Sequence, residues 1–173
     1  MRHKLFAVIA AAAFGIGLPV CAGAATAPRT TVTSMAQLPG PLPYPYTENA
    51  DAKLAVSQAF ARAKTSGKRV LIEFGGNWCP DCRILAGVMQ LPEVQSFVAS
   101  HYETATVDVG RFDRNLDVVS KFGIAKLQGV PTVVIADADG KPVNVTNSAD
   151  LDNAREMTPQ GIADWLARWA DGP

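Results

Sequence analysis

Apolar residues recur every three or four positions in several stretches of the chain, which is the spacing of one helix face. The clearest stretches run over Ala52–Ala63, Ile84–Met89, Leu116–Phe122 and Ile162–Trp169. Gly67 and Gly123 follow two of them, and glycine commonly terminates helices. Thr158 and Pro159 suit the N-cap and the first position of the last helix. The pattern therefore predicts four helices, with a further turn or two at Val94–Val98.

Three short runs rich in β-branched residues have the composition of strands. They are Val70–Phe74, Thr104–Val109 and Thr132–Ala136. After the third run, Asp139-Gly140 predicts a turn and Val143–Val145 a second strand, which together make a hairpin. The order of a strand–helix–strand unit, a hairpin and a last helix predicts an α/β fold. We expect its central mixed sheet to be flanked by helices on both faces.

The N-terminal segment has the layout of a secretory signal peptide. A basic start precedes the apolar run Leu5–Leu18, and Ala22-Gly23-Ala24 has the small residues of a cleavage site. The sequence predicts a signal peptide over residues 1–24, cleavage near Ala24 and export to the periplasm. Two alternatives stay open. The run could remain as a membrane anchor, although it is shorter than the roughly 20 residues of a spanning helix, or Cys21 could carry a lipid.

Residues 25–50 are rich in proline. Five prolines lie between positions 28 and 45, and each one fixes its own φ and lacks a backbone donor. The segment is therefore predicted to be an extended arm. Tyr44 and Tyr46 at its end could attach it to the domain, which we expect over residues 51–173.

Cys79 and Cys82 are the only cysteines left once residues 1–24 are removed. Two cysteines three positions apart close too short a loop to stabilise a fold, so the pair is expected to serve chemistry. A C-x-x-C sequence between a strand and a helix is typical of a redox-active dithiol.

The position of this pair predicts different roles for the two sulfurs. Cys79 would lie at a helix N-terminus, where free N–H groups and the macrodipole stabilise a thiolate. Cys82 would lie one turn later, close enough to form a disulfide. Cys79 is therefore predicted to attack a substrate, and Cys82 to resolve the mixed disulfide.

Other readings of the cysteine pair are weaker. A zinc site needs about four ligands, and the exported chain offers two cysteines and His101. A pair of buried structural thiols is the second alternative. We expect no metal and no cofactor beyond a redox-active Cys79–Cys82 disulfide. Sixteen basic residues balance sixteen acidic ones without a basic stripe, which sets nucleic-acid binding aside.

The residues around the pair resemble the thioredoxin superfamily. Trp78-Cys79-Pro80-Asp81-Cys82 matches its W-C-x-x-C active site, and Gly129-Val130-Pro131-Thr132 resembles its cis-proline loop. Glu73-Phe74 stands where thioredoxins carry a buried acid followed by phenylalanine. The resemblance extends from about Asp51 to Trp169 and implies a thioredoxin fold.

The resemblance also implies a surface for substrate binding. A cis Pro131 would put the backbone of Val130 beside Cys79, where a substrate strand could pair with it, and Trp78 would flank that place. An X–Pro bond adopts cis at little cost. The alternative is a trans proline at the start of an edge strand.

Glu73 is the candidate proton carrier. A carboxylate in an apolar strand should be desolvated, with a raised pKa, and could exchange a proton with Cys82. Alternatively it pairs with Lys68 or Arg69. The lysine that neighbours this acid in thioredoxins has no counterpart here, and Thr104 stands in its place.

Pro80 and Asp81 are expected to tune the redox potential, because the Asp81 charge opposes a thiolate on Cys79 and Arg83 could offset it. The Pro-Asp centre and the segment from Glu93 to Val98 are most similar to periplasmic thioredoxin-like domains, such as the C-terminal domain of DsbD.

The predicted function is a monomeric thiol–disulfide oxidoreductase acting on protein thiols and disulfides. A membrane thiol reductase is a candidate electron donor. Oxidants of the DsbA type carry a helical insertion and a histidine in the C-x-x-C centre, and both are missing here, which favours a reductant. The alternatives are an oxidant that donates disulfides and a non-catalytic binding module.

Overall fold

The computed structural model describes residues 25–171, so the predicted signal peptide lies outside the described residues. The strands are β1 (Arg69–Gly75), β2 (Tyr102–Asp108) and β3 (Thr132–Ala136). The α-helices are α1 (Ala52–Ser66), α2 (Pro80–Met89), α3 (Pro92–His101), α4 (Leu116–Ser120) and α5 (Pro159–Arg168). Three short 3-10 helices complete the elements: η1 (Met35–Gln37), η2 (Val145–Asn147) and η3 (Ala154–Glu156).

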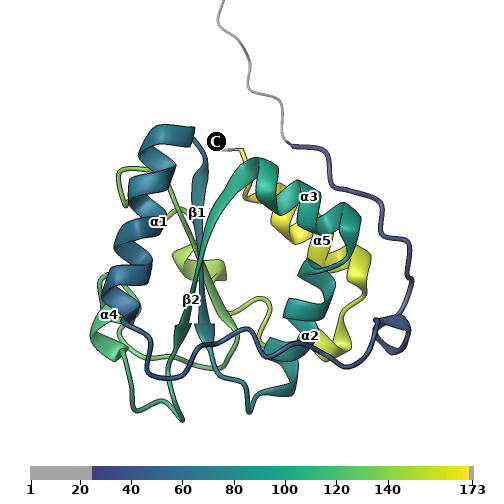
Figure 1. The fold of residues 1–173 in the computed structure, drawn as a ribbon, viewed down its shortest axis with the longest axis horizontal. Helices are drawn as coiled ribbons and strands as arrows, with labels where there is room; N and C mark the ends of the chain where they lie inside the picture. The colour runs from purple at the N-terminus through teal and green to yellow at the C-terminus, as the bar shows by residue number, and fades with distance from the viewer. Residues whose placement is uncertain (1–24, 172–173) are drawn as a thin grey trace, which may run out of the picture.

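The sheet has the order β2-β1-β3, with β1 in the centre. β1 pairs parallel to β2 and antiparallel to β3. In Figure 1, α1 and α4 lie on one side of the sheet, and α2, α3 and α5 lie on the other. The predicted α/β class and the mixed sheet with helices on both faces are confirmed.

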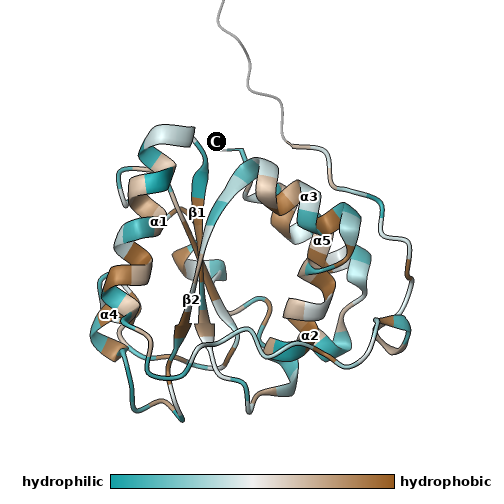
Figure 2. Cartoon of the chain, in the orientation of Figure 1, coloured by the Kyte–Doolittle hydropathy of each residue, from teal (hydrophilic) through white to brown (hydrophobic). Residues whose placement is uncertain are grey.

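Two apolar cores lie on the two faces of the sheet. Alternate β1 residues supply them: Ile72 and Phe74 pack in the core under α1, and Leu71 in the core under α2 and α5. Figure 2 shows the apolar colour concentrated on the strands and on the turns of α2 and α5. Because β1 is buried on both faces, a charged residue within it needs a partner.

Local capping residues fix the helix ends, and the roles of Gly67 and Thr158 are as predicted. Asp51 caps α1 by accepting from the Leu54 N–H at 2.9 Å. Gly67 ends this helix in the left-handed region with φ 74°, a conformation that glycine adopts without strain. Thr158 caps α5 by accepting from the Gly161 N–H at 3.0 Å.

The chain turns after β3 as predicted, with the Gly140 N–H donating to the Asp137 carbonyl at 3.1 Å, but the predicted second strand of the hairpin is wrong. Ala136 and Pro142 form an isolated bridge, and the segment then turns into η2 instead of continuing as a strand. The reason lies in the side chain of Asn144, which is buried. Its amide accepts from the Ile135 N–H at 2.8 Å and donates to the Val133 carbonyl at 2.9 Å. One side chain thus satisfies backbone groups that a strand would have satisfied.

Element lengths also differ from the pattern. α3 has ten residues instead of one or two turns, and β2 begins at Tyr102, two residues before the predicted start. Within residues 25–171, no helix combines the length and the apolar character needed to cross a membrane.

The proline-rich arm is attached along its length. In Figure 1 it passes α3 and α5, crosses beside α2 and reaches α1. Near its start, the Gln160 side chain accepts from the Thr30 N–H at 3.0 Å. Further on, Arg83 donates to the carbonyls of Leu42 and Pro43 at 2.9 and 3.2 Å. The arm is therefore held by side chains of the helices it covers.

Replacing Asn144 tests its part in the sheet. Asn144→Ala leaves two buried backbone groups without partners, each worth about 1–3 kcal/mol. We expect the free energy of unfolding in urea to fall by about 2–4 kcal/mol. Asn153→Ala, at an exposed asparagine, serves as the control and should cost under about 0.5 kcal/mol. Equal losses in the two variants would contradict this account of Asn144.

Candidate active site

Cys79 is the N-cap residue of α2, as the sequence predicts. The chain leaves β1 through Gly75 and Gly76, and the Cys79 N–H donates to the Gly76 carbonyl at 3.0 Å. The Cys79 sulfur accepts from the Cys82 N–H at 3.4 Å. Cys79 is 4% exposed and Cys82 is fully buried, and both are free thiols. Of the two cysteines, only Cys79 retains any exposed surface.

The two thiols have opposite pKa shifts. The Cys82 thiol, together with backbone N–H groups at the start of α2, hydrogen-bonds the Cys79 sulfur and lowers the pKa of Cys79 to about 6. The same contact and burial raise the pKa of Cys82. At neutral pH Cys79 is therefore a thiolate and Cys82 a protonated thiol, which are the states that an attacking and a resolving cysteine need.

Val130 and Pro131 lie directly beside the reactive sulfur. The peptide bond between them is cis. The Val130 carbonyl lies 3.2 Å from the Cys79 sulfur and accepts its hydrogen bond when the thiol is protonated. Backbone groups of this loop thus face the place where a substrate disulfide must approach.

Trp78 stands next to Cys79 at the surface and is 39% exposed. Its indole N–H donates to the Gly110 carbonyl at 2.6 Å, and the Arg111 guanidinium lies 4.7 Å from its ring centre. The ring of Phe112 meets it edge-on at 6.0 Å. Phe112 has φ 67°, a strained conformation for a bulky residue that is typical of functional sites.

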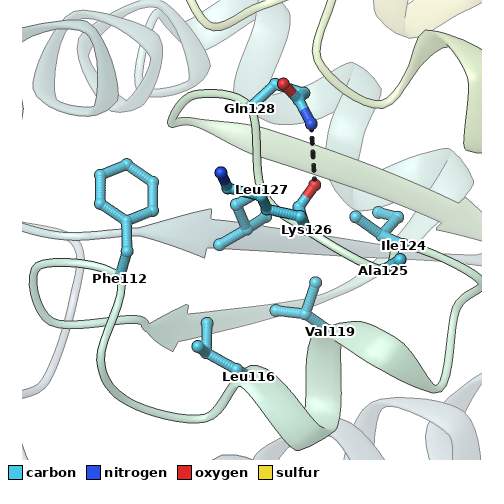
Figure 3. A pocket seen from close by; sticks show the side chains of 8 residues that line it. All are labelled: Phe112, Leu116, Val119, Ile124, Ala125, Lys126, Leu127 and Gln128. Atoms are coloured by element: carbon cyan, nitrogen blue, oxygen red, sulfur yellow. Dashed lines mark hydrogen bonds between the residues drawn. The ribbon is translucent and has the colours of Figure 1, made fainter.

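An apolar groove of about 450 Å³ extends from Phe112 between α4 and the segment before Val130. Figure 3 shows the side chains that line it. They include Leu116, Val119, Ile124, Leu127 and Gln128. Phe112 and Leu116 are 40% and 43% exposed. Together with Trp78 they form an apolar surface that leads away from the reactive sulfur.

Glu73 is buried in β1 with only 2% of its surface exposed. Its partner is neither Lys68 nor Arg69, which donate to the carbonyls of Ala99 and Trp169. The hydroxyl of Tyr46, at the end of the arm, donates to its Oε1 instead.

Burial raises the pKa of Glu73 to about 7, although the hydrogen bond from Tyr46 opposes that shift. Thr104 is exposed and pairs with Leu71. Among the described residues, the polar partner of this acid is therefore Tyr46 and not Thr104.

Asp81 is 3% exposed and pairs with Arg155 of η3. The Arg155 backbone donates to Oδ1 at 2.8 Å, and its Nε lies 3.0 Å from both carboxylate oxygens. Burial alone would raise the pKa of Asp81, but these bonds hold it below its usual value. The expectation that Arg83 offsets this charge is wrong, because Arg83 stacks on Tyr44 at 4.0 Å and holds the arm.

The structure thus brings the predicted residues Glu73, Trp78, Cys79, Pro80, Asp81, Cys82, Val130 and Pro131 to one end of the sheet. Sequence reasoning missed the roles of Tyr46, Phe112 and Arg155. Tyr46 was noticed only as an anchor of the arm, and no spacing signal links the other two to the cysteines. Across residues 25–171, no three His, Cys, Asp or Glu side chains converge to hold a metal ion.

The chain is similar to known proteins. The profile of the thioredoxin-like family matches residues 51–138. A disulphide isomerase from Xylella fastidiosa has 40% identity and a TM-score of 0.71, covering 76% of this chain and 100% of its own. A thioredoxin from Alicyclobacillus acidocaldarius is 32% identical over 84 residues, which are 49% of this chain and 71% of that protein.

A protein disulfide-isomerase from Schizosaccharomyces pombe is 31% identical over 100 residues. The match covers 56% of this chain but only 26% of the yeast protein. The chain therefore corresponds to about a quarter of that relative. The finer likeness to the C-terminal domain of DsbD stays a prediction.

The raised pKa of Glu73 makes stability depend on pH. In the unfolded chain this acid ionises near 4.5, and in the folded protein only near 7, so ionisation favours unfolding as the pH rises between these values. Glu73→Gln should therefore stabilise the reduced protein at pH 8.5 by up to about 3 kcal/mol and have little effect at pH 4. Urea unfolding at both pH values measures this difference.

Glu48→Gln, at an exposed position of the arm, is the matched control and should change stability at neither pH. If Glu73→Gln is no more stable than the parent protein at either pH, ionisation of the buried Glu73 carboxylate does not destabilise the folded state.

Proposed function

This chain belongs to the thioredoxin-like family of thiol–disulfide oxidoreductases, and on that premise we propose that it works in the periplasm as a reductant of protein disulfides. The single observation that carries the proposal is the position of the Cys79 sulfur at the N-terminus of α2, where it accepts from the Cys82 N–H and its pKa is lowered to about 6. The periplasmic location is supported by the signal-peptide pattern of residues 1–24.

The reaction runs in two exchanges. The Cys79 thiolate attacks one sulfur of a substrate disulfide, the substrate S–S bond breaks, and its other sulfur leaves as a thiolate, which takes a proton from the solvent. Cys82 then loses its proton and attacks the Cys79 sulfur, which releases the second substrate sulfur. Two electrons pass to the substrate, and the protein is left with a Cys79–Cys82 disulfide. A membrane thiol reductase could restore the dithiol.

The degree of thiolate stabilisation favours reduction over oxidation. A dithiol becomes a strong oxidant when its reduced form is strongly stabilised, as in DsbA with a cysteine pKa near 3.5, whereas thioredoxin has about 7. The pKa of Cys79, about 6, lies nearer to thioredoxin. The buried Asp81 charge raises the pKa of Cys79, which weakens the thiolate and makes the dithiol more reducing.

The surface beside Cys79 favours polypeptide substrates over small disulfides. The Val130 carbonyl can accept from a substrate backbone. The groove that begins at Phe112 is lined by apolar side chains and continues from the edge of Trp78. We propose that it binds a bulky apolar side chain located a few residues from the substrate cysteine.

A second candidate is the isomerisation of wrong disulfides. It is favoured by the 40% identity to the disulphide isomerase of Xylella fastidiosa, whose whole length this chain covers. An isomerase starts from the same reduced dithiol, but it ends with its own thiols still reduced. Recovery of activity by scrambled ribonuclease without added reductant would favour this candidate.

The direction of transfer is tested by the equilibrium potential of the Cys79–Cys82 pair in glutathione buffers. We expect a value closer to the roughly −270 mV of thioredoxin than to the roughly −120 mV of DsbA. The protein should also reduce insulin with turnover, and Cys79→Ser should abolish this activity. A potential near roughly −120 mV would show that the protein is an oxidant. Insulin turnover by Cys79→Ser would rule out the dithiol mechanism.

The groove is tested with Leu116→Ala, which shortens an exposed side chain of its wall. Losing roughly half the burial of a leucine-sized contact should raise the KM for a peptide disulfide with leucine or phenylalanine near its cysteine about fivefold to tenfold. The rate with glutathione disulfide should not change. Leu54→Ala, at an exposed leucine on α1, is the control. Equal KM values for the two variants would contradict binding in the groove.

A further inference from the structure

Tyr46, near the end of the proline-rich arm, is buried inside the protein. It is 3% exposed, and the Asn77 side chain fixes its backbone from both sides. The Tyr46 N–H donates to Asn77 Oδ1 at 3.1 Å, and Asn77 Nδ2 donates to the Tyr46 carbonyl at 2.7 Å. Since Asn77 directly precedes Trp78, the tyrosine is held by the loop that carries the reactive cysteine.

The Tyr46 hydroxyl lies between two groups that exchange protons. It donates to Glu73 Oε1, and it also lies against the Cys82 sulfur. A Cβ atom on Gly75 would collide with the hydroxyl oxygen and would lie 2.6 Å from that sulfur. Both atoms therefore occupy the space left by the missing side chain, and glycine is required there.

Among the described residues, no hydrogen bond joins Glu73 directly to Cys82. Burial, the Glu73 charge and the Cys82 sulfur raise the pKa of Tyr46 well above its usual value, so the hydroxyl keeps its proton at neutral pH. Asp81, the other nearby carboxylate, is engaged by Arg155. Within residues 25–171, the hydroxyl therefore lies next to both the resolving thiol and the buried acid, and it is hydrogen-bonded to the acid.

We propose that Tyr46 is a further catalytic residue, whose hydroxyl carries the proton of Cys82 to Glu73 when the mixed disulfide is resolved. The proposal rests on the proposed function, because it concerns the second exchange of the same dithiol. It also gives the arm, which lies outside the matched family segment, a part in the chemistry.

The step conserves protons and electrons. The Cys82 S–H proton passes to the Tyr46 oxygen while the Tyr46 O–H proton passes to Glu73. The Cys82 thiolate then attacks the Cys79 sulfur, the new S–S bond forms, and the bond between Cys79 and the substrate breaks. The substrate leaves as a thiolate with the electron pair of that bond. Tyr46 is unchanged at the end, and Glu73 is protonated.

The test uses Tyr46→Phe and the small disulfide dithionitrobenzoate, which releases a coloured thiol in each exchange. We expect the first release, by Cys79, to stay within about twofold of the parent protein. The second release, by Cys82, should slow about tenfold to a hundredfold at pH 7, in line with the loss of a proton-transfer group. Tyr44→Phe changes the exposed tyrosine of the same arm and should leave both rates unchanged.

The pH profile separates a proton path from a packing effect. The second release should rise through the pKa of Glu73, about 7, in the parent protein. Because Tyr46→Phe breaks the path from Cys82 to Glu73, it should remove this inflection from the second release. A packing role would keep the inflection and only move it to higher pH, because the Tyr46 hydrogen bond lowers the pKa of Glu73. Cys79 and Cys82 also face this site, so the first release is recorded at each pH as the reference.

A double variant and a solvent isotope measurement test two further consequences of the proton path. Glu73→Gln combined with Tyr46→Phe should be no slower than Glu73→Gln alone, since both act on one path. In the parent protein, the second rate should depend quadratically on the deuterium fraction of the solvent, because two protons move. An unchanged second release, equal slowing of both releases, additive slowing in the double variant or a linear isotope dependence would each overturn the proposal.

These assays use a small disulfide and the separate exchange steps. They therefore report on Tyr46 even if the protein proves to be an oxidant or an isomerase. Failure to reduce insulin would count against the proposed function, and an unchanged second release would count against the role of Tyr46.

Discussion

The stabilisation of the Cys79 sulfur at the start of α2, by the Cys82 N–H and the neighbouring Cys82 thiol, is the interaction on which the site depends. It stabilises a thiolate on Cys79, although burial of that residue opposes the charge, whereas burial and the neighbouring sulfur both keep the proton on Cys82. The burial of this site also affects the charged side chains around the two cysteines. Glu73 and Asp81 are also buried, and a buried carboxylate is tolerated only with a partner. Much of the surrounding structure serves to provide these partners.

The partners come from the two segments that lie outside the central strand–helix–strand unit. The arm supplies Tyr46 to Glu73, and η3 supplies Arg155 to Asp81. Both segments are in turn fastened by residues near the cysteines, since Asn77 holds Tyr46 and the Asp81 carboxylate accepts from the Arg155 backbone. The chemistry and the attachment of these segments therefore depend on the same contacts.

Features that depend on local patterns could be predicted from the sequence. Contacts between side chains far apart along the chain could not. Periodicity identified the helices and the three paired strands, and the C-x-x-C spacing placed Cys79 at a helix start. The missing fourth strand could not be foreseen, because Asn144 looks like any turn residue until its amide replaces backbone partners. Arg155 is 74 positions from Asp81, and its pairing follows from tertiary packing alone. The same is true of Tyr46 and Glu73, 27 positions apart.

Because these contacts come from distant parts of the chain, the W-C-x-x-C motif alone does not determine the redox potential. Asp81 inside the motif raises the pKa of Cys79, but the size of that effect depends on how closely Arg155 neutralises the carboxylate. The same five residues beside a different η3 segment would carry a differently compensated charge and hence a different potential. The redox character of this protein is therefore a property of the motif together with the chain that folds back on it, and it has to be assigned from the assembled site.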